Sequence, residues 1–212
     1  GFTRTLVRDL LTHPLLADAT LSLMDIDPER LSFIERAVKR IVKEGKYPAR
    51  VEATRDRRTA LEGADAVLCT ILAGGVDVWR HDIEIPKKYG ISINVGDTRG
   101  PSGIFRALRT IPVMLDICRD IEQVAPRAIL LNYTNPMTTL TKVLSSICTG
   151  PVVGLCHGLF ENLDFIKRLY KIESEDLISA KYAGLNHFFW ITELRTPGRD
   201  LMADLGRRLR RQ

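Results

Sequence analysis

The fold is decided by residues 128–158, AILLNYTNPMTTLTKVLSSICTGPVVGLCHG. Two short apolar runs, 128–131 and 152–155, each end in polar residues, and the segment between them repeats apolar residues at helical spacing. Such runs are typical of strands that are buried on both faces of a parallel sheet. Ligands of open parallel sheets bind beyond the carboxyl ends of the strands, so the polar residues placed there are candidates for a binding site.

The alternation of strands and helices extends outward from this stretch. The elements expected before it occupy residues 20–24, 28–45, 50–54, 66–72 and 103–125. This order predicts a Rossmann-like, doubly wound parallel α/β fold with the architecture of the lactate and malate dehydrogenases.

The pattern changes to simple alternation from residue 178, and FFWITEL at 188–194 indicates a strand of a different sheet. We therefore predict a dinucleotide-binding domain at 1–172 and the start of a second, α+β catalytic domain at 173–212.

The composition indicates a folded protein without a membrane-spanning segment. It has 212 residues, of which 45% are hydrophobic, so it can bury a full core. Its apolar runs are far shorter than the roughly 20 residues that cross a bilayer, and no leading segment resembles a signal peptide. We expect a cytoplasmic protein with no membrane partner. The net charge of +5 is concentrated partly at Arg207, Arg208, Arg210 and Arg211, so we expect no nucleic-acid surface either.

The cysteines are Cys69, Cys118, Cys148 and Cys156, and none of them forms a CxxC pair. Most lie inside apolar runs, so we interpret them as reduced thiols, three of them in the core, rather than as a disulfide framework.

Asp25 stands at the tip of the strand at 20–24, where a dinucleotide-binding fold places the carboxylate that accepts the ribose hydroxyls. The alternative is that Asp25 or Asp27 only caps the helix that Pro28 starts. The glycine-rich half of that fingerprint would lie mostly upstream of Gly1, and we expect that the first strand and phosphate loop precede this chain. Small residues at 73–75 would let a cofactor approach the backbone, or would form an ordinary turn.

Cys156 and His187 are the candidates for metal ligands. A thiolate and an imidazole from separate segments can bind a borderline transition metal and leave positions open for substrate oxygens. The alternatives are a packed cysteine and a structural histidine. His157, beside Cys156, could act as an acid or bond to a substrate hydroxyl.

Asn132 and Asn135 follow a strand, where an amide can bind sugar hydroxyls or a nicotinamide carboxamide; the alternative is a turn that needs Asn before Pro136. Arg99, in a glycine-rich loop, could hold an anionic group. We interpret the arginines of the helix at 103–125, including Arg106 and Arg109, as a solvated face.

A resemblance adds what spacing cannot. The motifs that carry it, in order, are GFTRTLVRDLL, LMDID, GDTRGPSGIFRALRTIP, NYTNPM, CHG and GLNHFFW. Together they resemble the NAD- and metal-dependent family 4 glycoside hydrolases, in the branch of α-galactosidases, α-glucosidases and α-uronidases. The match covers nearly the whole chain. Family members are considerably longer and carry a GxGS turn, of which Gly1 and Phe2 would be the surviving cofactor-binding part, so we expect a chain truncated at both ends.

The resemblance implies that Cys156 and His187 bind a divalent ion, usually Mn²⁺, together with the C2 and C3 oxygens of the sugar. Asn135 would contact the substrate and Asp25 the adenosine ribose. The implied chemistry is oxidation at C3 by NAD⁺, loss of the acidified C2 proton, elimination of the aglycone, addition of water and return of the hydride. The resemblance implies that the base that removes the C2 proton is supplied by a later domain.

Subgroups of the family differ in the residues that follow the cysteine. His157 argues against a sugar-phosphate substrate, and Gly158 favours uronides, whose carboxylate Arg99 could meet. The alternatives are a lactate- or malate-type NAD-dependent dehydrogenase and a non-catalytic NAD-binding sensor. We expect a small-molecule glycoside as substrate and a homo-oligomer, a dimer or tetramer, as the assembly.

Overall fold

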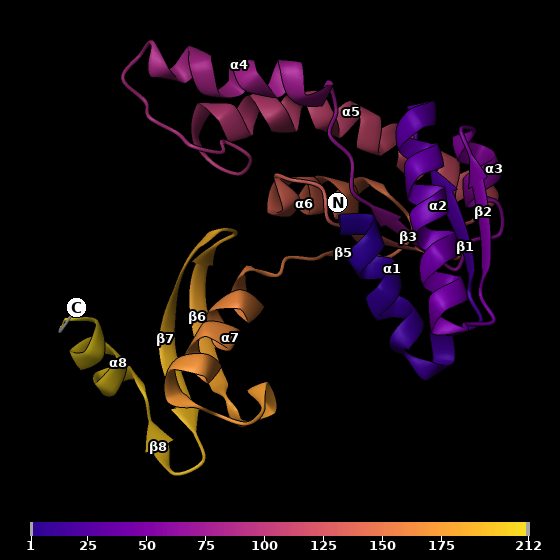
Figure 1. Cartoon of the computed structure of the whole chain (residues 1–212). Helices are drawn as coiled ribbons and strands as arrows, with labels where there is room; N and C mark the ends of the chain where they lie inside the picture. Colours follow the sequence, from indigo (N-terminus) through magenta and orange to yellow (C-terminus); the bar gives the residue numbers. More distant parts are fainter. Residues whose placement is uncertain (1, 211–212) are drawn as a thin grey trace. The chain divides into compact units, whose positions relative to one another are not determined.

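The computed structural model describes the backbone of residues 2–210 and, within that range, all side chains except those of Phe2, Glu175 and Leu209. Its contacts divide the chain between Gly154 and Leu155 into two compact units. The first unit contains parallel strands and the second an antiparallel sheet (Figure 1). The domain change predicted near residue 172 stays a prediction.

The first unit begins with two parallel strands, β1 (Thr20–Met24) and β2 (Arg50–Thr54), paired in register along their whole length. Helices α1 (Phe2–Thr12) and α2 (Pro28–Gly45) lie side by side, and α2 contacts both strands (Figure 1). Short helices, η1 (Pro14–Leu16) and α3 (Arg57–Leu61), complete this part. The buried residues that these elements share are Val7, Leu11, Leu23, Leu31 and Val38. The expected bounds of both strands and of α2 are confirmed.

The same unit contains a second parallel sheet, in the order β3 (Ala66–Cys69), β4 (Ile129–Asn132) and β5 (Val152–Gly154). Its helices are α4 (Gly75–Lys87), α5 (Gly100–Val124) and α6 (Met137–Ile147). Figure 1 shows α4 lying along α5, and α5 also packs against α6. Buried apolar residues of α5, α6 and β4 form the core of this part, including Met114, Leu130, Leu140 and Leu144.

Strand β3 ends three residues earlier than expected. Beyond Cys69 the regular strand pairing ends. The N–H of Ile71 donates instead to the hydroxyl oxygen of Thr134, at 3.0 Å. The same hydroxyl donates to the Cys69 carbonyl at 3.3 Å. A side chain thus replaces the neighbouring strand as hydrogen-bond partner, which an apolar run in the sequence cannot reveal.

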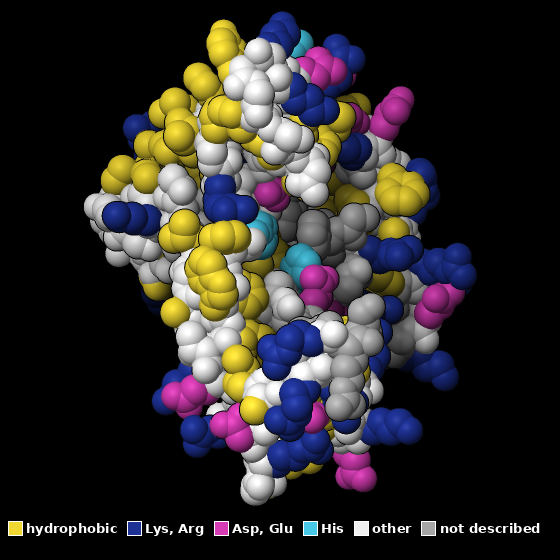
Figure 2. Space-filling model, turned by 90° about the vertical axis from the view of Figure 1, so that its left-hand side faces the viewer, with side chains coloured by type: hydrophobic (Ala, Val, Ile, Leu, Met, Phe, Trp, Pro, Cys, Tyr) yellow, Lys and Arg dark blue, Asp and Glu magenta, His cyan; other side chains and the backbone are white. Residues whose placement is uncertain are grey.

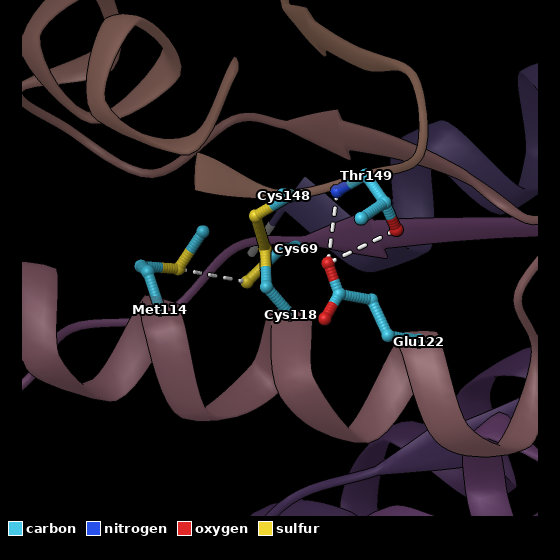
Figure 3. The surroundings of a disulfide bond; sticks show 6 residues. All are labelled: Cys69, Met114, Cys118, Glu122, Cys148 and Thr149. Carbon is cyan, nitrogen blue, oxygen red and sulfur yellow. Dashed lines mark hydrogen bonds between the residues drawn. A yellow bond between two sulfur atoms is a disulfide. The ribbon is translucent and has the colours of Figure 1, made fainter. Parts of the chain in front are cut away.

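The interpretation of all four cysteines as reduced thiols was wrong for two of them. Cys118 of α5 and Cys148, which follows α6, form a disulfide across the packed helices, with Cα atoms 6.1 Å apart (Figure 3). Their 30-residue separation hides the pairing in the sequence, because only the packing of α5 on α6 brings the sulfurs together. Cys69 and Cys156 are free cysteines.

The second unit combines α7 (Gly158–Tyr170), η2 (Glu175–Leu177), an antiparallel sheet of β6 (Ser179–Leu185), β7 (Phe188–Thr196) and β8 (Arg199–Asp200), and α8 (Met202–Leu209). Ile166, Leu194 and Leu201 form its buried core. The expected change to a different sheet is confirmed. Large apolar side chains of β6 and β7 are exposed, among them Tyr182 and Trp190, and the face in Figure 2 shows many exposed hydrophobic side chains in yellow.

The predicted class is confirmed: the first unit is α/β, with parallel strands and covering helices in the manner of Rossmann-like proteins. Among the described residues, no helix has both the length and the apolar character needed to span a membrane.

Candidate functional site

The side chain of Asn135 lies just beyond β4 and is held by two hydrogen bonds. Its Nδ2 donates to Oδ2 of Asp97 at 2.8 Å, and its Oδ1 accepts the backbone N–H of Met137 at 3.3 Å. An ionised carboxylate only accepts, so Asp97 fixes which end of the amide is the donor. The two bonds use one N–H and one lone pair, and the amide can offer the others to a hydroxyl-rich ligand.

Asn132, the other amide considered, is part of the turn itself. Its side chain is fully buried; Nδ2 donates to the Met137 carbonyl and to the Thr141 hydroxyl, and Oδ1 accepts from the N–H of Thr134. The structural alternative therefore holds for Asn132, because these bonds already occupy both ends of its amide.

The loop before α5 brings Asp97 to the end of β4. It is also fastened to α4, because the indole N–H of Trp79 donates to the Val95 carbonyl at 2.8 Å. The contact between Asp97 and Asn135 spans 38 positions, and sequence reasoning missed it. The only signal was a carboxylate within a glycine-rich loop.

Arg99 lies two residues after Asp97, is exposed and occupies the N-cap position of α5. The helix starts at Gly100, three residues earlier than expected, because Pro101 is well suited to a first helical turn. The assignment of Arg99 to the substrate stays a prediction.

The arginines of α5 are not all on a solvated face, and that interpretation was wrong for Arg109. Its side chain is 23% exposed and forms an ion pair with Asp82, which is 6% exposed. Arg106 is half-buried, and burial lowers its pKa while nearby Asp97 and Asp82 oppose the shift. Its Nε atom is buried without a hydrogen-bond partner among the described residues. Helical spacing gave no sign of this, because the partners come from α4 and the loop after it.

Asp25 and Asp27 make different contacts, which the sequence alone did not distinguish. Asp27 caps α2, because its carboxylate accepts the N–H groups of Glu29 and Arg30. Asp25 accepts the N–H of Asp27 and pairs with the Arg30 guanidinium at 2.9 Å. Partial burial raises the pKa of Asp25, but hydrogen bonds from Arg30 and Asp27 outweigh it, so the pKa lies below its ordinary value.

The surroundings of Asp25 are open. A shallow depression lined by residues 26–30 adjoins it. Gly1, expected to touch the cofactor, lies outside the described residues, and of Phe2 only the backbone at the start of α1 is described. The binding role of Asp25, Gly1 and Phe2 stays a prediction.

Cys156 follows β5 by two residues and is a partly buried free thiol whose sulfur accepts the N–H of Gly158 at 3.5 Å. His157 precedes α7, and its Nε2 lies 3.3 Å from a carboxylate oxygen of Glu161, one helical turn on. His157 is thus half-exposed and oriented along α7 rather than enclosed in a core.

His187 is exposed in the turn between β6 and β7, with φ of 59°. Gly184, with φ of 146°, lets the two strands approach, since a Cβ there would lie 2.5 Å from the Phe188 carbonyl oxygen. Asn186, beside His187, has a buried Oδ1 without a hydrogen-bond partner among the described residues.

The predicted metal site has donors that suit a borderline divalent ion. Cys156 and His187 belong to the same compact unit and offer one sulfur and one nitrogen. The unsatisfied Oδ1 of Asn186, the residue before His187, is a further hard oxygen acceptor in this turn. No group of three or more His, Cys, Asp or Glu that could hold a metal occurs within residues 2–210 as described. The assignment of the two ligands stays a prediction.

Parallel strands followed by polar side chains, with Asp25 after β1 and Asn135 after β4, define a Rossmann-like α/β protein. The model of the family 4 glycosyl hydrolases matches residues 1–172. The chain belongs to this family, which decides against the alternative of a lactate- or malate-type dehydrogenase.

Three similar proteins illustrate the match. An α-galactosidase of Rhizobium meliloti is 39% identical over 96% of this chain and 42% of its own length. An α-galacturonidase of Bacillus subtilis is 34% identical over 91% of this chain and 44% of its own. The structure of a 6-phospho-β-glucosidase from Thermotoga maritima, solved with NAD and glucose-6-phosphate, superposes with a TM-score of 0.87 at 25% identity, over 98% of this chain and 50% of that one. The chain thus spans less than half the length of these two curated relatives.

Proposed function

We propose that the protein to which this chain belongs cleaves α-glycosides, using NAD⁺ and a divalent ion, with Mn²⁺ as the preferred metal. The observation that carries the proposal is the family match over residues 1–172, which includes Asp25, Asn135 and Cys156. The α-galactosidase and α-galacturonidase relatives support an α-linked, unphosphorylated substrate.

Each proposed residue has one task. Asn135, its amide oriented by Asp97, bonds to a sugar hydroxyl, and Asp25, kept ionised, accepts ribose hydroxyls. Cys156 and His187 hold the metal, and His157 donates a hydrogen bond or a proton to the substrate. When bound, NAD⁺ and the ion supply hydride transfer at C3 and stabilisation of negative charge on the sugar oxygens.

The substrate is a galactoside, a glucoside or a uronide. Arg99 is exposed two residues after Asp97, a position from which a guanidinium can pair with a uronate carboxylate. An Arg99→Ala variant would then lose activity on uronides and retain it on neutral glycosides.

The decisive experiment assays full-length protein against p-nitrophenyl α-galactoside, α-glucoside, α-galacturonide and α-glucuronide with NAD⁺, Mn²⁺ and a thiol reductant. Cleavage that requires both NAD⁺ and Mn²⁺ supports the proposal. Binding of NAD⁺ and Mn²⁺ without cleavage of any α-glycoside would show a non-catalytic sensor instead. A cytoplasmic location stays a prediction.

A further inference from the structure

A partly buried ion pair joins α4 to α5. Arg109 Nη2 lies 2.6 Å from Asp82 Oδ2, and Nη1 lies 3.2 Å from Oδ1. The Asp82 side chain is 6% exposed, so this pair is shielded from water. Two parallel N–H···O bonds fix the plane of the guanidinium. Attraction to a single point charge would not fix this orientation.

The third nitrogen of Arg109 holds the turn after β3. Its Nε donates to the carbonyl of Ala73 at 3.1 Å. A Cβ added to Gly74 would lie 3.1 Å from Cδ of Arg109, so the arginine side chain packs directly against this turn. The Ser102 hydroxyl donates to the Asp82 carbonyl and ties the start of α5 to the same cluster.

The turn itself, residues 73–75, lies just beyond the carboxyl end of a parallel strand. It follows the carboxyl end of β3, next to β4 with Asn135, and ligands of such sheets bind at this edge. Gly74 and Gly75 have φ of 82° and 71°, a conformation that glycine adopts without strain. At Gly75 no described residue other than its neighbours in the helix and along the chain has an atom within 4 Å of the place that a Cβ would take, so the backbone is open there.

We propose that Arg109 is a positioning residue for NAD⁺. Clamped by Asp82, it holds the Ala73 carbonyl and so sets the backbone of the 73–75 turn against which the dinucleotide lies. This inference rests on the proposed function, because it assumes that NAD⁺ occupies this edge. Arg109 should therefore affect the affinity for NAD⁺ and should not affect the reaction steps at the sugar.

The test compares Arg109→Lys with Arg57→Lys in the full-length protein. Lysine keeps the charge opposite Asp82 but cannot also donate to Ala73 in the same geometry. Arg57 is a matched control, because its guanidinium also forms an ion pair with a carboxylate of α5, Asp120. The readouts are NAD⁺ affinity by calorimetry, Mn²⁺ affinity, and thermal stability.

We expect Arg109→Lys to weaken NAD⁺ binding about tenfold, the value of one charge-assisted hydrogen bond. Binding of Mn²⁺ should stay unchanged, and kcat at saturating NAD⁺ should be retained. Arg57→Lys should change NAD⁺ affinity by less than about twofold.

Equal NAD⁺ affinity in Arg109→Lys and the parent protein overturns the inference and leaves the proposed function standing. A parent protein that does not bind NAD⁺ overturns both. If Arg109→Lys does not fold, Asp82→Asn replaces it; this variant keeps the shape of the clamp and loses its charge, and unchanged affinity there would also overturn the inference.

Discussion

A cysteine and a histidine, Cys156 and His187, carry the proposed metal chemistry, and neither is enclosed in an apolar core. Cys156 is partly buried with an N–H group bonded to its sulfur, and His187 is exposed in a turn that Gly184 makes possible. Cys69 is the contrasting residue, since burial raises the pKa of its thiol to about 11. The buried Cys69 thiol is therefore poorly suited to ionise and bind a metal, whereas Cys156 is only partly buried.

Cys156→Ser and His187→Ala should each reduce Mn²⁺-dependent cleavage by about 100-fold or more, because each removes one of the two proposed protein ligands. Binding of NAD⁺ should be largely retained, since Asp25 belongs to another unit. His13→Ala is the matched control, an exposed histidine outside the proposed site. Steady-state kinetics across a Mn²⁺ series measures the effect; full activity in either ligand variant would remove the proposed metal site.

Asp97→Asn should lower kcat/KM for the glycoside by about tenfold to 100-fold, the value of a hydrogen bond to a charged group. The variant could also donate to Asn135, so the orientation of that amide would no longer be fixed. Asp116→Asn, at an exposed position of α5, is the control. Unchanged kcat/KM in Asp97→Asn would mean that the Asn135 amide does not depend on this carboxylate.

Helix α5 connects several helices of the first unit. It packs against α3, α4 and α6, and it contributes Arg109, Asp120 and Cys118 to three separate cross-links. The disulfide reaches the segment between α6 and β5, where Thr149 also donates its N–H and hydroxyl to Glu122 (Figure 3). This segment leads into β5 and then to Cys156, so α5 fixes the start of the strand that precedes the thiol.

Removing the disulfide should destabilise the protein. Closing a loop of 30 residues is worth about 3–4 kcal/mol in the chain-entropy model, so a Cys118→Ala/Cys148→Ser variant should unfold at lower denaturant concentration. Added dithiothreitol should shift the parent protein in the same direction and leave the variant unaffected. Thiol labelling at pH 8 checks the pairing: native protein should label at Cys156, and Cys148 should react only after reduction. Labelling of Cys148 without reductant would contradict the bond.

The start of α2 should lose stability in acid. Because the folded pKa of Asp25 lies below its ordinary value of 3.8, the carboxylate contributes stability above about pH 4. That contribution should be lost as the pH falls through the lower folded value. Acid unfolding followed by circular dichroism should show a smaller loss between pH 4 and pH 2 in Asp25→Asn than in the parent. Parallel acid curves for the two proteins would refute the contribution.

The whole chain spans less than half the length of its curated relatives. Large apolar side chains stay exposed on β6 and β7, including Leu185, Phe188 and Trp190, where Phe188 and Trp190 stack edge to face. Exposed aromatic surface of this kind is typical of faces that another protein segment or subunit covers.

The full-length protein should therefore be a homo-oligomer, a dimer or tetramer. Light scattering coupled to size-exclusion chromatography measures its mass directly. Trp190→Lys, which places a charge on this face, should reduce assembly if the face lies between subunits, with the exposed Tyr89→Lys as control. A monomeric parent protein would contradict the expectation.

The sequence predicted the elements well because each carries its own pattern. The helical stripe of α2 and the apolar run of β4 are local, and Pro28 and Gly45 mark the ends of α2. Prediction failed where the partner of a residue lies far along the chain. The Thr134 hydroxyl accepts a hydrogen bond from the segment after β3, and Cys148 forms a disulfide with Cys118. Asp82 forms an ion pair with Arg109, whose side chain is partly buried.

The α/β class, the family and the polar residues after the strands could be predicted from the amino-acid sequence, because periodicity and motifs are properties of neighbouring residues. The folded structure was needed to show that Asp97 orients Asn135 and that Arg109 supports the 73–75 turn. These depend on contacts between elements up to 38 positions apart, and hydrogen bonds are formed by distance and direction in space, to which spacing along the chain gives no guide.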